Sequence, residues 1–201
     1  MAKPIWLNTS KSSGSGNDTV AVSTTSPFTG RVARSGVVTF RASGVTDRTV
    51  TVNQAGKPEF VTIQSAASVA QNGGSVTITG KSNSSKLTFS LGTGALTITI
   101  PSSYTAASAS TNNGSVISGD PGAGGEFDFS ITISGIAANG GTTEKTRQLT
   151  VTANGAQTAT CLITQAAGAA TLTVSPTTID LTWEGTAQNI TVTSNTTWEV
   201  I

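Results

Sequence analysis

The chain has 201 residues and a formal net charge of +1, with eleven Lys and Arg against ten Asp and Glu. Only 10% of its residues are charged, 36% are hydrophobic, and 22 are glycine. Low charge with sufficient Val and Ile excludes a disordered chain, and the scarcity of Leu, Lys and Glu disfavours a helical one. The composition therefore predicts folded β domains.

The first residues and the number of cysteines indicate in which cellular compartment the chain folds. No apolar run approaches the ~18 residues of a membrane span, and the start MAKPIWLNTS does not resemble a signal peptide. We therefore expect synthesis in a cytoplasm and no membrane association. The single Cys161 excludes an intrachain disulfide, and its place in an alternating run with Ala159 and Ile163 predicts a buried thiol.

Strands are predicted where apolar and polar residues alternate with period two. In chain order, the alternating runs are residues 19–22, 50–52, 76–78, 96–100, 127–133 and 149–151. Turn sequences separate them, among them Asn72-Gly73-Gly74 and Asn113-Gly114. We therefore expect an all-β fold of antiparallel sheets with one apolar and one polar face.

A repeat organises these strands. Gln54 and Gln165, which end similar strands, stand 111 residues apart (165 − 54), and Ser82-Asn83 returns as Ser194-Asn195 with a spacing of 112 (195 − 83). A unit of about 111 residues has the size of an immunoglobulin-like sandwich. The repeat therefore predicts tandem immunoglobulin-like β-sandwiches.

The repeat divides the chain unevenly. Residues 58–168 make one complete sandwich with a long insert at 101–125, residues 1–57 correspond to the closing half of a unit, and residues 169–201 correspond to the opening half. The first segment carries seven basic and two acidic residues, a net charge of +5, whereas the last carries three acidic residues and no basic one. Opposed charges favour head-to-tail contact between chains, although so small a count also arises by chance.

Two segments resemble the BACON domain, an immunoglobulin-like module of Bacteroidetes and their phages. The opening half is carried by Leu172-Thr173-Val174-Ser175-Pro176, Gly185, residues 190–195 and Trp198-Glu199-Val200. The closing half is carried by Trp6-Leu7, residues 13–16 and 19–22, the arginines near Arg31 and Arg34, and residues 49–56. The middle unit departs from the pattern, since no Trp follows Ser82-Asn83, and it is only BACON-like.

Three arrangements would complete the two half-units. The chain continues beyond Ile201 in a longer parent protein, its own halves close on each other, or another chain supplies strands to residues 1–57. Self-closure is disfavoured because a sandwich starts and ends at opposite poles, roughly 17 to 20 Å apart. Covering an open half would gain on the order of 10 to 20 kcal/mol, against an association cost of ~4 to 15 kcal/mol.

Four arginines form the candidate docking face of residues 1–57, namely Arg31, Arg34, Arg41 and Arg48. Nucleic-acid binding would need denser positive charge and interleaved aromatic rings, so we expect no nucleic acid. The expected partner is another copy of the chain, a capsid protein, or both.

Two aromatic side chains are candidates for stacking on a sugar ring. Tyr104 lies in the polar insert and is expected to be an exposed ring, while Trp183 shares an alternating face with Ile179 and Leu181 and is expected to pack in a core. Trp6 and Trp198 stand at positions that the BACON family uses near its core.

No catalytic constellation is present in the sequence. It has no His, and Glu126 and Asp128, which alternate with Phe127 and Phe129, are expected on the wet face of a strand. We expect neither an enzyme nor a cofactor. The resemblance implies a structural protein of a phage virion, such as a capsid decoration or head fibre that docks through its N-terminal part; the alternative is a carbohydrate-binding or adhesive module at a bacterial cell surface.

Overall fold

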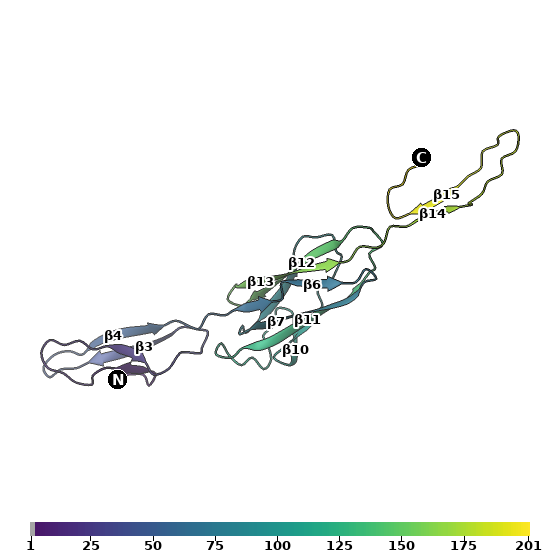
Figure 1. Ribbon diagram of the computed structural model, residues 1–201. Coiled ribbons are helices and arrows are strands. Elements are labelled where there is room, and N and C mark those ends of the chain that lie inside the picture. Colours follow the sequence, from purple (N-terminus) through teal and green to yellow (C-terminus); the bar gives the residue numbers. More distant parts are fainter. Residues whose placement is uncertain (1–2) are drawn as a thin grey trace.

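The computed structural model describes residues 3–201, and these residues form strands and loops without any helix. The predicted all-β class is confirmed, and the strand pairs are antiparallel except for one pair in the central sandwich. Three parts follow one another in an elongated row (Figure 1). We call them the N-terminal unit (3–57), the central sandwich (58–168) and the C-terminal unit (169–201). In the described part of the chain, no helix is long and apolar enough to cross a bilayer.

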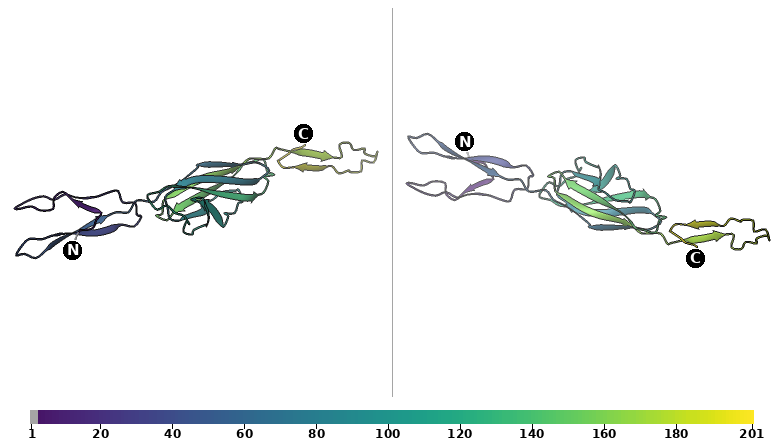
Figure 2. Two further views of the ribbon diagram at one scale, coloured as in Figure 1. Left: turned by 90° about the horizontal axis from the view of Figure 1, so that it is seen from below. Right: turned by 90° about the horizontal axis from the view of Figure 1, so that it is seen from above.

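The N-terminal unit consists of two hairpins. Its strands are β1 (Leu7–Thr9), β2 (Val22–Thr24), β3 (Arg34–Phe40) and β4 (Arg48–Gln54). Strand β1 pairs with β2, and β3 pairs with β4, both antiparallel. Leu7 and Val38 are buried, and a side chain at Gly36 would collide with Trp6, so the hairpins meet there without intervening space. Their far ends diverge, as Figure 2 shows.

The central sandwich has two sheets. Its strands are β5 (Val61–Ile63), β6 (Ala66–Val69), β7 (Gly74–Ser82), β8 (Leu87–Leu91), β9 (Ser103–Ala106), β10 (Ala109–Asn112), β11 (Phe127–Ile136), β12 (Lys145–Ala153) and β13 (Thr158–Gln165). One sheet has the order β10-β9-β11-β7-β5 and the other the order β6-β13-β12-β8.

The core of the central sandwich lies between these sheets. Alternation places Ile131 and Ile133 of β11 inward from one sheet, and Leu149 and Val151 of β12 inward from the other, all fully buried. The Phe89 ring packs edge-on against two further rings of this core. Cys161 is buried in the same core, as predicted.

Two features of the central sandwich differ from the sequence prediction. Residues 96–100 form no strand, although Leu96 contacts β12 through two hydrogen bonds: its N–H donates to the Thr146 carbonyl, and its own carbonyl accepts from Arg147 Nε. Strand β6 pairs with β13 in parallel, so the sheets are not antiparallel throughout.

The C-terminal unit is a single long hairpin. Strand β14 (Leu172–Ser175) pairs antiparallel with β15 (Thr191–Ser194), and the intervening residues form a loop. This unit lies at the opposite end of the molecule from the N-terminal unit (Figure 1), so the two do not cover each other within one chain.

Candidate functional site

The N-terminal unit leaves apolar side chains uncovered. By the 111-residue repeat, Phe40 of β3 corresponds to Val151 of the central sandwich, and Val50 of β4 corresponds to Cys161. The two central residues are fully buried, whereas Phe40 is 42% exposed and Val50 is also exposed. Positions that belong to a core in one unit are therefore open to solvent in the other.

Phe40 also lines a groove between the two hairpins. Its volume is about 560 Å³, and Val20, Val38 and Phe40 contribute apolar wall while Lys3, Lys11 and Arg41 contribute positive charge. Most of the other lining residues are polar, and Asp18, which pairs with Lys11, is the one acidic residue among them. A groove of mixed lining with an excess of positive charge suits a partner segment that carries both apolar and acidic side chains.

Arg34 is used inside the N-terminal unit. Its guanidinium lies 4.2 Å from the ring centroid of Trp6 and 4.1 Å from that of Phe28, and its Nε donates to Oε1 of Gln54 at 2.9 Å. A planar cation between two ring faces is a cation–π arrangement. Arg34 therefore joins the loop before β1, the segment before β3 and the end of β4.

Arg31 is used at the junction with the central sandwich. Its guanidinium donates two hydrogen bonds to the Asp120 carboxylate, each 2.7 Å long, and lies 3.1 Å from Oε1 of Glu59. It also donates to the Asn83 carbonyl. The hydrogen bonds and charge of Arg31 hold the pKa of Asp120 below its ordinary value, and the bonds to Asp120 raise the pKa of Arg31.

The structure does not gather the four predicted docking arginines into one face. Arg31 and Arg34 are engaged as described, and Arg41 pairs with Asp47 across the turn between β3 and β4 at 2.8 Å. Arg48 is exposed at the start of β4. The sequence therefore located the basic segment, but not the groove that accompanies it.

The prediction that Tyr104 is an exposed ring is wrong. Tyr104 lies on β9, inside the insert, and is only 4% exposed; its ring packs edge-on against Phe89 with 4.8 Å between centroids. Burial raises the pKa of Tyr104 to about 12. A ring held in this way has no face to offer a sugar.

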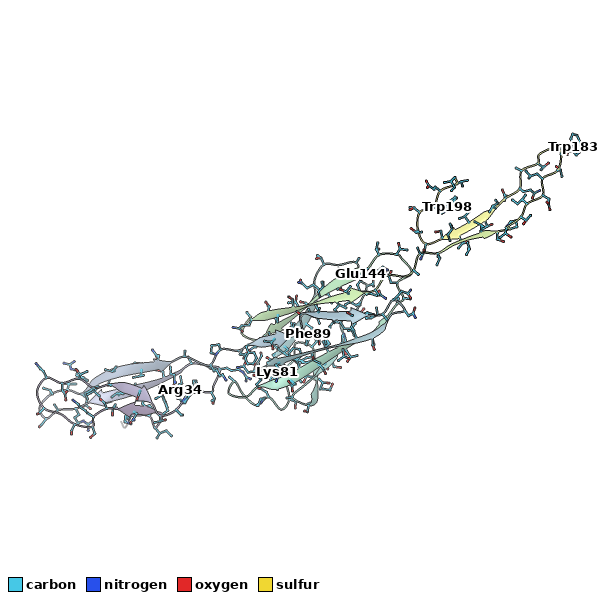
Figure 3. All side chains as sticks on the ribbon, in the orientation of Figure 1. Arg34, Lys81, Phe89, Glu144, Trp183 and Trp198 are labelled. Carbon is cyan, nitrogen blue, oxygen red and sulfur yellow. The ribbon has the colours of Figure 1, made fainter. Side chains whose placement is uncertain are left out.

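Trp183 is exposed, against the expectation that it packs in a core. It lies in the loop between β14 and β15, outside any strand, and is 94% exposed; Figure 3 shows it at the tip of the C-terminal unit. Trp198 is also exposed, while Trp6 is half-buried against Arg34. Of the two candidate stacking residues, the structure leaves Trp183 available.

The remaining titratable groups form no catalytic cluster in the part of the chain that is described. Glu126 and Asp128 lie on the exposed side of the sheet, as predicted, and both contact Lys81 Nζ, at 3.1 and 3.3 Å. No group of three His, Cys, Asp or Glu among residues 3–201 could hold a metal ion. Burial raises the pKa of the Cys161 thiol, which makes it a weaker nucleophile at neutral pH.

Comparison with known proteins gives a family match and distant structural likenesses. No curated protein matches the chain. Among solved structures, the chain is similar to an endo-fucoidan hydrolase of glycoside hydrolase family 107, with 14% identity and a TM-score of 0.23 over 84% of this chain and 23% of that one. The chain thus spans less than a quarter of that hydrolase, and a likeness of this size carries no argument about activity.

The N-terminal unit carries the family match. The matching family is BACON, described as "Putative binding domain, N-terminal", and the matched residues are 2–55. They include both N-terminal hairpins and the groove between them. Residues 2–55 of the chain therefore carry a match to the BACON family.

Proposed function

We propose that the chain is a non-enzymatic binding and assembly protein of a phage virion, such as a capsid decoration or head fibre. It docks through its N-terminal unit and projects the central sandwich away from the docking surface. The observation that carries the proposal is the groove of about 560 Å³ between the N-terminal hairpins, at one end of an elongated molecule (Figure 1).

Two features support docking at this end. The groove coincides with the segment that matches a binding-domain family. The Arg31 contacts with Asp120 and Glu59 fasten this unit to a well-packed sandwich, so that a bound partner and the projecting body are held in a fixed relation.

Purified particles test the virion role. Phage particles banded on a density gradient should contain the chain at a fixed ratio to the major capsid protein, measured by quantitative mass spectrometry. Antibodies to the central sandwich should label the outside of intact particles in electron microscopy. Absence from the particles, with recovery in the bacterial envelope fraction, would reject the virion role.

A second candidate function is carbohydrate binding, which the exposure of Trp183 favours. An indole ring that is 94% exposed at the tip of a hairpin can stack on the apolar face of a pyranose. A glycan array with the wild-type chain tests this candidate. Trp183→Ala should abolish any glycan signal, while Leu181→Ala, at an exposed apolar residue of the same loop, should preserve it. Equal signals from both variants would exclude Trp183 as the platform.

A further inference from the structure

We infer that the C-terminal unit of one copy completes the N-terminal unit of a second copy, so that copies join head to tail. The inference rests on the proposed assembly role and specifies its partner. Within one chain the two units lie at opposite ends (Figure 1), so the contact must form between chains.

The N-terminal unit reproduces the closing strands of the central sandwich in register. In β3–β4, Arg34 pairs with Gln54; in β12–β13, Lys145 pairs with Gln165, and both members are displaced by 111 residues. At the same displacement, β2 falls on residues 133–135 within β11, whereas β1 falls on residues 118–120, which form no strand. Among residues 3–57, no strand corresponds to β5, β6, β7 or β8.

The C-terminal unit supplies the opening strands in the same register. In β5–β7, Val61 pairs with Ser82; in β14–β15, Leu172 pairs with Ser194, displaced by 111 and 112 residues respectively. The turn that follows β6 is also repeated. Gly73 and Gly185, 112 apart, both have positive φ, and their N–H groups donate to the carbonyls of Ala70 and Thr182, which are also 112 apart.

The exposed side chains of the C-terminal unit occupy core positions. Ile190 corresponds to Ile78, which is fully buried in the central sandwich, yet Ile190 is 55% exposed. Leu172 is likewise exposed, whereas its counterpart Val61 is buried. The two terminal units therefore present the two halves of one core, each without its cover in the single chain.

The charges of the two units also match. The N-terminal groove is lined by three cations, Lys3, Lys11 and Arg41, and by one anion, Asp18, which pairs with Lys11. The C-terminal unit carries only acidic charges, at Asp180, Glu184 and Glu199. Opposite charges across such a contact speed association and select the head-to-tail orientation over head-to-head or tail-to-tail contact.

The central sandwich predicts which residues meet. Thr132 of β11 lies opposite Thr77 of β7, with 2.9 Å between their hydroxyl oxygens on the outer face. The counterparts are Ala21 (132 − 111) in one copy and Asn189 (77 + 112) in the next. In the second sheet, Ile163 pairs with Ala67, which places Val52 beside Ile179 of the other copy.

Cysteine cross-linking of the full chain tests this pairing. Ala21→Cys and Asn189→Cys are made as separate variants, mixed, and oxidised with oxidised glutathione; the native Cys161 is buried and stays in place. We expect a covalent dimer in the mixture and little in either variant alone, because each variant carries only one of the two partners. No dimer in the mixture, or homodimers in the separate samples, would overturn the inference.

A matched pair of charge variants tests the apolar contact. Val50→Asp places a carboxylate on the face that the second copy would cover, whereas Thr51→Asp places the same charge on the opposite face of β4. We expect cross-linking to be lost in the first background and retained in the second. Equal cross-linking in both would show that this face is not covered, and circular dichroism checks that both variants fold.

The two proposals fail in different ways. If the chain is present in virions but does not cross-link, the proposed function is supported and the head-to-tail contact is rejected. If the chain cross-links as expected but is absent from virions, the head-to-tail contact is supported and the virion role is rejected.

Discussion

Asn195 holds the C-terminal hairpin by the same hydrogen bonds with which Asn83 anchors the central sandwich. The Phe60 N–H donates to Oδ1 of Asn83 at 2.7 Å, and Asn83 Nδ2 donates to the Pro58 carbonyl at 3.1 Å. In the C-terminal unit, the Thr171 N–H donates to Oδ1 of Asn195, and Nδ2 donates to the Ala169 carbonyl, both at 2.8 Å. The C-terminal hairpin therefore repeats the local hydrogen-bond geometry of the first strands of the central sandwich.

Replacement of Asn83 should destabilise the central sandwich. Asn83 is fully buried, and Asn83→Ala would leave the Phe60 N–H and the Pro58 carbonyl without these partners. We expect a loss of about 1 to 3 kcal/mol in the free energy of unfolding, measured by urea denaturation. Asn112→Ala, at an exposed residue of β10, should change it much less. Equal losses would show that the buried bonds of Asn83 are not the cause.

Removal of Arg31 should loosen the junction between the N-terminal unit and the central sandwich. Arg31→Ala deletes the contacts with Asp120 and Glu59, both largely buried, across this junction. We expect faster proteolysis within residues 55–60 and a broader distance distribution in small-angle X-ray scattering. Arg48→Ala, at an exposed arginine of the same unit, serves as the control and should behave like the wild type.

The junction should also loosen in acid. The pKa of Asp120 is lowered by its hydrogen bonds with Arg31, so its contribution to stability is complete above the ordinary value of 3.8. It is lost as the pH falls below 3.8 through the lowered pKa of the folded protein. The rate of cleavage at the junction by an acid-active protease should therefore rise only below this pH. In Asp120→Asn, which has no carboxylate to protonate at this position, this pH-dependent rise should be absent.

Arg34→Lys should weaken the N-terminal unit although it keeps the charge. An ammonium group cannot lie flat between Trp6 and Phe28 while it also donates to Gln54 as the guanidinium does. Cation–π contacts of this kind are worth about 0.5 to 2 kcal/mol. Hydrogen exchange at the amides of β3 and β4 should become faster than in Arg48→Lys. Unchanged protection would show that the stacked cation is not what holds these hairpins.

Tyr104 should titrate only at very high pH. It is the one tyrosine of the chain, so the tyrosinate absorbance near 295 nm reports on it alone. Burial raises its pKa to about 12. The neutral hydroxyl therefore contributes its full share to the stability of the fold below pH 10.0, the ordinary pKa, and this contribution is lost as the pH rises through about 12. In urea the transition should return to about 10. A native transition near 10 would contradict the buried position.

Regular strands could be predicted because their burial follows a local pattern. Alternation identified residues 127–133 and 149–151, which lie within β11 and β12. The same pattern predicted that Glu126 and Asp128 lie on the solvent-exposed face of the sheet. The repeat could be found because Gln54 and Gln165 end corresponding strands.

Features that depend on distant segments could not be predicted in this way. The ring of Tyr104 is buried because Phe89, from another sheet, packs against it, and the polar composition of the insert concealed this contact. Residues 96–100 alternate like a strand, but no neighbouring strand pairs with them in a continuous ladder. Arg31 finds Asp120 at a separation of 89 residues, so the charge count alone placed it on a free surface.

Sedimentation velocity of the wild-type chain over a range of concentrations tests the head-to-tail contact most directly. Completion of one unit by the next copy predicts species larger than the 20.1 kDa of one chain, which grow with concentration and are lost in Val50→Asp but not in Thr51→Asp. A single species of 20.1 kDa at every concentration, equal in all three proteins, would contradict it.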